Sequence, residues 1–137
     1  MAGGTVPVPT PETAPFWAGA LAGELRIQQC DSCGKYYFYP RPFCRYCQSR
    51  DVSWRTVSGL GRLVSYVINY RPLPPADPNE PQVIALVELD EGPRMMTNIV
   101  GMSPEPGNLP LDGRVRVEFE QRGDQALPVF RLSAEAA

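Results

Sequence analysis

The pattern of hydrophobic and polar positions divides the chain into segments of different period. Residues 1–12 mix Gly, Pro and Thr without a period, which predicts a flexible arm. Residues 13–25 carry an apolar stripe at helical spacing and predict a short helix, with Thr13 as its cap and Pro15 in its first turn. Because so short a helix is marginal alone, we expect the stripe to pack on the body of the chain or on another subunit. The stripe consists of Phe16, Trp17, Ala20, Leu21 and Leu25.

From Val57 onward the pattern is that of β-strands. Residues 57–70 predict one long strand with a bend or bulge near Gly59 and Gly61. Residues 71–81 hold five prolines, which excludes a helix or a central strand there. The other predicted strands are 82–90, 93–101, 114–121 and 127–132, joined by a turn at 91–92, a loop with a turn of helix at 103–113 and a turn at 124–126. Five strands with turn-rich spacers in about 75 residues predict a small closed or partly closed barrel.

The composition is that of a soluble globular chain. Of its 137 residues 43% are hydrophobic and the mean hydropathy is −0.24, which suits one domain, or one domain with a small appendage. No apolar run is long enough to span a membrane, and residues 1–10 lack the features of a secretory signal, so we expect a cytoplasmic protein. The chain has no histidine, which excludes a Ser–His or Cys–His pair, an imidazole base and every histidine-containing metal site.

Charge is distributed unevenly along the chain. Residues 26–62 contain seven basic and two acidic side chains, so they carry a net +5, and the rest of a chain whose total is −2 carries −7. Such an asymmetry is typical of a face that meets an anionic ligand or partner. A solvated surface on a small subdomain explains it equally well.

The four cysteines form two CxxC pairs, Cys30 with Cys33 and Cys44 with Cys47, separated by ten residues. Each CxxC turn presents two thiolates on one side of a tight loop, and four such ligands suit a tetrahedral zinc ion. The aromatic spacer 34–43 predicts a short hairpin between the pairs. Disulfides, iron and redox use are the alternatives, but the missing secretion signal and the matched pairs favour zinc. Because such a site uses all four thiols it would be closed, and therefore structural.

These motifs resemble a family of bacterial and archaeal proteins that join a zinc ribbon to an OB fold, once called a domain of unknown function and now described as acyl-CoA-associated. The resemblance covers roughly residues 15–132. It is carried by the helix leading into CxxCG, the Pro-Arg-Pro approach to the third cysteine, and the Ser-Gly-x-Gly sequence before the barrel. Members often have Pro after the third cysteine and Gly after the fourth, where this chain has Arg45 and Gln48.

The resemblance implies a mainly β fold with an N-terminal helix, a rubredoxin-like zinc ribbon and a five-stranded OB barrel. The parts we predict are an arm at 1–12, the helix and ribbon at 13–54, the barrel at 55–133 and a tail at 134–137. Family members accompany thiolase-like acyltransferases or retro-aldolases, including those of steroid side-chain breakdown, and related domains are fused to MaoC-type hydratase subunits. They support the partner while supplying few or no catalytic groups, which agrees with the absence of histidine from this chain.

We therefore expect a non-catalytic accessory subunit that docks on a thiolase-like enzyme, shapes its substrate channel and contributes no catalytic residue. Aromatic side chains dominate interface energetics, so the candidate docking residues are Phe16, Trp17, Tyr36, Tyr37, Phe38 and Tyr39, with ribbon core as the alternative for each of the four in the Tyr36–Tyr39 run. The phosphates of a coenzyme A bound with the partner favour arginine, so the candidate phosphate ligands are Arg41, Arg45 and Arg50, unless these are simply solvated.

Two other function classes fit the sequence less well. An OB barrel with a zinc ribbon could bind single-stranded nucleic acid, but the barrel half of the chain is acidic and has few aromatic residues. An independent enzyme would have to use groups such as Tyr66, Tyr70, Glu88 or Asp90, and their spacing places no base near a nucleophile.

Overall fold

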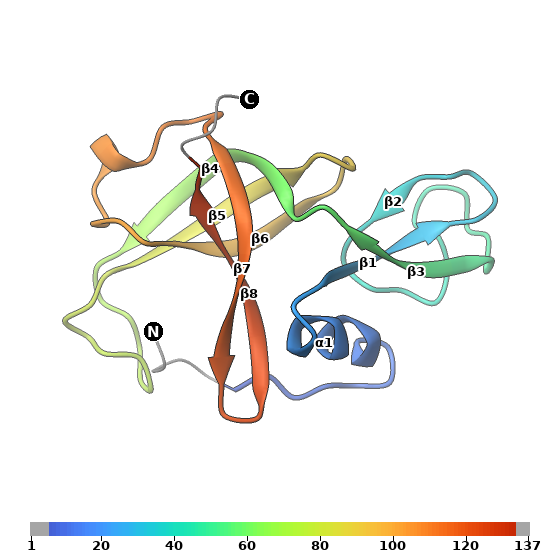
Figure 1. The fold of residues 1–137 in the computed structure, drawn as a ribbon, viewed down its shortest axis with the longest axis horizontal. Coiled ribbons are helices and arrows are strands. Elements are labelled where there is room, and N and C mark those ends of the chain that lie inside the picture. Colours follow the sequence, from blue (N-terminus) through green and yellow to red (C-terminus); the bar gives the residue numbers. More distant parts are fainter. Residues whose placement is uncertain (1–5, 134–137) are drawn as a thin grey trace.

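The computed structural model describes residues 6–133, so part of the predicted arm and the whole predicted tail at 134–137 lie outside the described residues. Along the chain a helix is followed by a small three-stranded sheet and then by a barrel (Figure 1). The mainly β fold predicted from the sequence is confirmed. Among the described residues, no helix has the length and apolar character needed to cross a membrane.

The helix α1 is shorter than predicted and spans Ala14–Leu21. Pro15 lies in its first turn as expected, but Thr13 makes no capping bond, because its Oγ1 accepts a hydrogen bond from the Thr10 backbone N at 3.0 Å. The chain leaves the helix through Gly23, whose φ of +78° suits glycine at a helix end. Leu25 therefore belongs to the next strand and not to the helix stripe.

The ribbon sheet consists of β1 (Leu25–Cys30), β2 (Tyr36–Tyr37) and β3 (Val52–Val57) in the order β2-β1-β3. Both neighbours run antiparallel to β1. The predicted hairpin within residues 34–43 is wrong, since only two residues of this spacer are a strand and they pair with β1. Pro40 and Pro42 explain the difference, because neither has an N–H to donate to a second strand. The ribbon sheet continues to Val57, beyond the boundary predicted at residue 54.

The predicted five-stranded barrel is confirmed, and it is closed in the order β4-β5-β6-β8-β7. The long strand predicted at 57–70 is interrupted at residues 58–59, where Gly59 has a φ of +75° and the chain passes from the ribbon into the barrel. The predicted bend is therefore present at Gly59, and a separate shift in the register of β4 with β5 lies between Leu63 and Ser65. The turn at 91–92 and the helical turn at 106–108 are present, and residues 71–81 form neither helix nor strand. The barrel strands are β4 (Leu60–Asn69), β5 (Gln82–Leu89), β6 (Arg94–Val100), β7 (Arg114–Arg122) and β8 (Gln125–Leu132).

One hydrophobic core holds the helix, the ribbon and the barrel together. Alternate residues of β5 face inward and are buried, as expected for a strand with one face on a core. The same cluster contains Phe16 of α1, Ile27 of β1 and Phe38 of the ribbon, packed with Phe130 of β8. The ribbon therefore does not form an independent unit joined by a linker, because its apolar side is covered by the helix and the barrel.

Candidate metal centre and binding surfaces

The four cysteines lie together at the end of the ribbon sheet. Their Sγ atoms are all within 4.8 Å of one another, with 3.5 Å between Cys30 and Cys47 and 3.7 Å between Cys33 and Cys44. A zinc ion with Zn–S bonds of about 2.3 Å in a tetrahedron separates neighbouring sulfur atoms by about 3.8 Å. Cys30 and Cys44 are fully buried, whereas Cys33 and Cys47 are exposed. The four predicted ligands therefore have the spacing that a tetrahedral metal ion requires.

The two metal knuckles share one backbone geometry. The Gly34 N–H donates to the Cys30 carbonyl, and in the second knuckle the Gln48 N–H donates to the Cys44 carbonyl, both at 2.9 Å. Each turn then closes with a residue at positive φ, Gly34 at 78° in the first knuckle and Gln48 at 65° in the second. Gln48 thus occupies the position where the resemblance predicted Gly, and the knuckle forms despite the substitution.

Hydrogen bonds prepare two of the thiols for metal binding. At Cys30 the backbone hydrogen bond from Cys33 lowers the pKa. At Cys44 burial opposes ionisation, but hydrogen bonds from the backbone of Cys47 and Tyr46 outweigh it and lower the pKa to about 6. At Cys47 the backbone bond from Ser49 lowers the pKa, yet hydrogen bonding among the thiols raises it to about 11. Four clustered thiols cannot all ionise by themselves, so the site calls for a cation.

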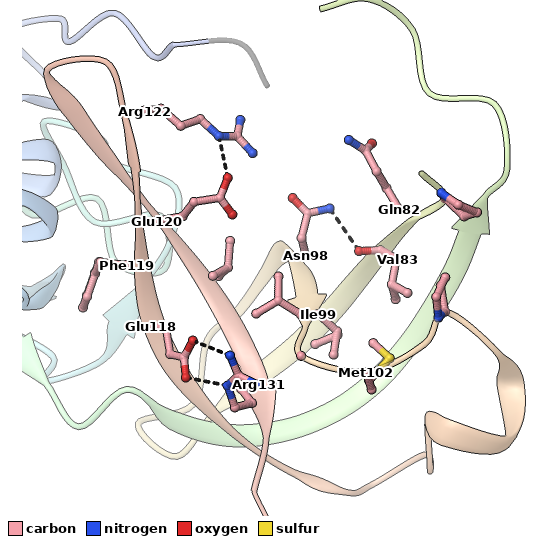
Figure 2. A pocket seen from close by; sticks show the side chains of 15 residues that line it. Gln82, Val83, Asn98, Ile99, Met102, Glu118, Phe119, Glu120, Arg122 and Arg131 are labelled. Atoms are coloured by element: carbon pink, nitrogen blue, oxygen red, sulfur yellow. Dashed lines mark hydrogen bonds and ion pairs between the residues drawn. The ribbon is translucent and has the colours of Figure 1, made fainter. Parts of the chain in front are cut away.

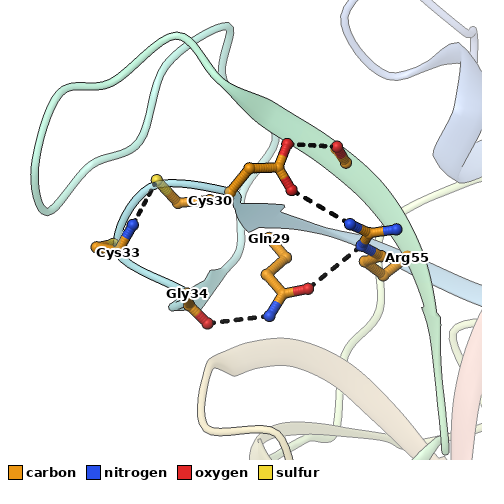
Figure 3. A network of polar contacts seen from close by, with 7 residues as sticks. Gln29, Cys30, Cys33, Gly34 and Arg55 are labelled. Carbon is orange, nitrogen blue, oxygen red and sulfur yellow. Dashed lines mark hydrogen bonds and ion pairs between the residues drawn. The ribbon is translucent and has the colours of Figure 1, made fainter.

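A polar network ties the first knuckle to the neighbouring strand β3 (Figure 3). Gln29 Nε2 donates to the Gly34 carbonyl at 3.1 Å, and Gln29 Oε1 accepts from Arg55 Nε at 3.2 Å. Arg55 also donates to the carboxylate of Asp31 at 3.2 Å, which in turn accepts from Ser53 Oγ at 2.6 Å. These contacts orient the turn that carries Cys33, and such supporting contacts tune metal affinity.

The structure divides the six aromatic residues predicted to dock a partner. Phe16, Tyr37 and Phe38 are buried in the chain's own core, with 6%, 1% and 8% of their surfaces exposed, so the docking role predicted for them is corrected. Trp17 and Tyr36 are half-buried, and Tyr39 is 52% exposed. Docking stays a prediction for these three.

The three arginines predicted to bind phosphate are all exposed on the loops between β2 and β3. Sequence reasoning missed Tyr46 beside them, which is 51% exposed and has Lys35 and Arg45 at 4.8 and 5.4 Å from its ring centroid. The available signal was its position inside a CxxC turn, because a tight knuckle turns the residues between the ligands away from the metal.

An apolar groove of about 290 Å³ lies where the helix, the ribbon and the barrel meet. Trp17 of α1, Tyr39 and Pro40 of the ribbon, Met96 of β6 and Pro128 of β8 contribute to its walls. Tyr39 and Met96, at 52% and 60% exposed, leave it open to solvent.

A second cavity, of about 500 Å³, lies between the end of β6 and the strands β7 and β8 (Figure 2). Its acidic and basic side chains form ion pairs, Arg131 with Glu118 and Arg122 with Glu120. Asn98 of β6 donates to the Val83 carbonyl on the neighbouring strand β5 at 3.0 Å. Because these charges are paired, the wall of the cavity presents no continuous basic surface to nucleic acid.

The acidic residues considered for independent catalysis are engaged in ion pairs. Glu88 pairs with Arg62 at 2.6 Å, and Asp90 forms a two-point pair with Arg114 at 3.0 and 2.8 Å. The arginine bonds also lower the pKa of Asp90, which keeps this carboxylate ionised. Tyr66 packs against the core, and Tyr70 is 61% exposed.

Comparison with known families matches both halves of the chain. Residues 17–53 match the family described as ChsH2, rubredoxin-like zinc ribbon domain. Residues 54–120 match the family described as ChsH2, C-terminal OB-fold domain. The ribbon and the OB barrel predicted from the sequence are confirmed, and the rubredoxin-like match together with the four clustered thiols makes the metal centre a structural zinc site.

Individual relatives give the same picture. The chain is 38% identical over 120 residues to a probable enoyl-CoA hydratase alpha subunit of Thermomonospora curvata, covering 85% of this chain and 36% of the relative. It is 39% identical over 93 residues to the 3-oxo-4,17-pregnadiene-20-carboxyl-CoA hydratase alpha subunit of Mycobacterium tuberculosis, covering 68% and 29%. The chain thus spans only about a third of the length of these relatives. A solved structure titled Ltp2-ChsH2(DUF35) aldolase has a chain with a TM-score of 0.80 and 32% identity, covering 93% of this chain and 98% of that one.

Proposed function

Because this chain belongs to the ChsH2 family, whose members join a rubredoxin-like zinc ribbon to an OB fold, we propose that it is an accessory subunit of a complex acting on acyl-CoA thioesters. The observation that carries the proposal is the similarity over nearly the full length of both chains to a chain of the Ltp2-ChsH2(DUF35) aldolase. The relatives named as CoA-ester hydratase alpha subunits support the same class of substrate.

In this proposal the partner is a thiolase-like enzyme, an acyltransferase or a retro-aldolase, that supplies the reacting groups. The chemistry of this chain supports that division of labour. Zinc takes all four thiols, and the carboxylates of Glu88 and Asp90 are held by arginines. The chain docks on the partner through exposed aromatic residues near the apolar groove and shapes the channel for the acyl group, with a steroid or lipid side chain as the substrate.

Co-expression with a thiolase-like protein from the same genome tests the proposal. We expect the two proteins to co-purify and the pair to cleave acyl-CoA substrates faster than either protein alone, measured by size-exclusion chromatography and by mass spectrometry of the products. Trp17→Ala, in the groove, should weaken the complex. Leu111→Ala is the matched control, because Leu111 is an exposed apolar residue (61%) on a barrel loop and does not line the groove. Absence of both co-purification and any change in cleavage would refute the proposal.

A further inference from the structure

Basic side chains in the described part of the chain fall into two groups. Most of them form ion pairs with neighbouring carboxylates. In contrast, five have no ion-pair partner among residues 6–133, and four of these five (Lys35, Arg41, Arg45 and Arg50) lie on the ribbon loops between β1 and β3, whereas Arg71 lies on a barrel loop. Of the two acidic residues on these loops, Asp31 is held by Arg55, which leaves only Asp51 to offset the four cations. The ribbon loops therefore carry an excess of unneutralised positive charge.

Exposed aromatic residues alternate with these cations. Tyr39, Phe43 and Tyr46 are 52%, 36% and 51% exposed, and Arg41 and Arg45 lie between them in the sequence. Tyrosine and arginine are the residues most enriched at the energetic centres of protein interfaces. We call this set the ribbon loop surface, and it comprises Lys35, Tyr39, Arg41, Phe43, Arg45, Tyr46 and Arg50.

Hydrogen bonds from buried side chains hold the ribbon loop surface in place. The backbone N–H of Arg41 donates to Oε1 of the buried Gln28 at 2.7 Å, and the Arg41 carbonyl accepts from Oη of the buried Tyr37 at 3.0 Å. The zinc site fixes the loop again at Cys44. A surface ordered before binding loses less conformational entropy when a partner arrives.

The ribbon loop surface also borders the apolar groove. Tyr39 and Pro40 line the groove together with Trp17 and Met96, and Arg41 follows Pro40 directly. An apolar centre with a charged rim is the usual arrangement of a protein–protein interface. This continuity favours a protein as the occupant, because the four cations of the ribbon loop surface are exposed and line neither the apolar groove nor the larger cavity, so neither cavity would enclose a phosphate bound to them.

We propose that the ribbon loop surface binds an acidic patch on the partner subunit, while an apolar side chain next to that patch enters the groove. This inference rests on the proposed function and adds the chemistry that the partner must present, which is carboxylates beside an exposed apolar anchor. The cations of the loops then find in the complex the ion pairs that they lack in the chain alone.

Charge reversal in the co-purified complex tests the inference. We expect Arg41→Glu/Arg45→Glu to weaken binding at least about tenfold at 50 mM NaCl, and we expect the wild-type affinity to fall as salt rises to 300 mM. Arg71→Glu is the matched control, because Arg71 is an exposed cation without an ion-pair partner among the described residues but lies on a barrel loop. Its affinity should stay within about twofold of wild type. Zinc content and circular dichroism verify that each variant is folded.

The possible results separate the inference from the proposed function. If wild-type chain forms no complex, both fail. If the complex forms but the double variant binds like wild type, or Arg71→Glu weakens binding equally, only the electrostatic docking is overturned. Coenzyme A and a single-stranded oligonucleotide serve as competitors. Displacement of the partner by either one, lost in the double variant, would assign the surface to phosphate and overturn the assignment to protein carboxylates.

Discussion

The backbone N–H and C=O of Arg41 are each hydrogen-bonded to a buried side chain from a different strand, and removing these two bonds should loosen the ribbon loop without removing a zinc ligand. Gln28 and Tyr37 are 6% and 1% exposed. Gln28→Leu leaves the Arg41 N–H without its 2.7 Å acceptor, which should cost about 1–3 kcal/mol. Tyr37→Phe keeps the ring and removes only the 3.0 Å bond to a carbonyl on an exposed residue, which water can reach, so about 1 kcal/mol is expected.

Combining Gln28→Leu with Tyr37→Phe in one protein tests the reasoning more strictly than either single variant. Both bonds hold one loop, so once the first is lost the second restrains less, and the combined cost should fall short of the sum by about 0.5–1 kcal/mol. Urea denaturation of zinc-loaded protein measures all three variants. Burial and the nearby Cys44 and Cys30 raise the pKa of Tyr37 from 10.0 to about 12, so the stability from this hydroxyl is complete below pH 10 and is lost as the pH rises through 12. Additive costs, or a Tyr37→Phe variant as stable as wild type, would refute the reasoning.

Three further predictions concern the second knuckle, an ion pair and the metal. Gln48 has a positive φ, which glycine adopts without strain, so Gln48→Gly should raise the unfolding free energy of the zinc-loaded protein by about 0.5–1 kcal/mol, measured by urea denaturation. A less stable variant would contradict the idea that Gln48 is strained. Arg114 lowers the pKa of Asp90, so the stability from their exposed pair exists above about pH 4 and is lost as pH falls further. Asp90→Asn should therefore cost about 0.5 kcal/mol at pH 7 and nothing near pH 2, and an equal cost at both values would refute this. Zinc chelation should speed amide exchange in β1–β3 far more than in β4–β8, and equal exchange would contradict a structural zinc.

Local patterns predicted most of the barrel. They failed where tertiary contacts decide which sheet a strand joins. The alternation in β7 and the proline-rich segment 71–81 are local signals, so their assignments were correct. Residues 57–70 have a continuous β pattern, yet Val57 is the last residue of β3, which pairs with β1 of the ribbon, and the barrel strand β4 begins only at Leu60. Which sheet a strand joins depends on distant partners, and only the positive φ at Gly59 marks the change of direction.

The same distinction between local and tertiary signals applies to the zinc ligands and to the aromatic residues beside them. Zinc ligands could be predicted because each CxxC turn is a local geometry, set by residues three apart. The burial of the aromatic residues at 36–39 could not be predicted in this way. Side chains alternate between two faces only within a strand, and β2 ends after Tyr37. Phe38 is therefore also buried, with its ring 5.4 Å from that of Phe16, and Tyr39 faces solvent. The contact of Phe38 with Phe16 of the helix is a tertiary one, which the local pattern of residues 36–39 does not reveal.

The shared core gives the zinc a role beyond the ribbon. Phe16, Ile27 and Phe38 pack in one cluster with Phe130 of the barrel, so the ribbon cannot reorient without opening that core. The zinc fixes the loops, the loops fix one wall of the apolar groove, and the helix and β6 form its other walls. A partner that binds the ribbon loop surface therefore also sets the position of the barrel. In the proposed complex, the contribution of this chain to the partner's substrate channel would be this rigid arrangement of helix, ribbon and barrel.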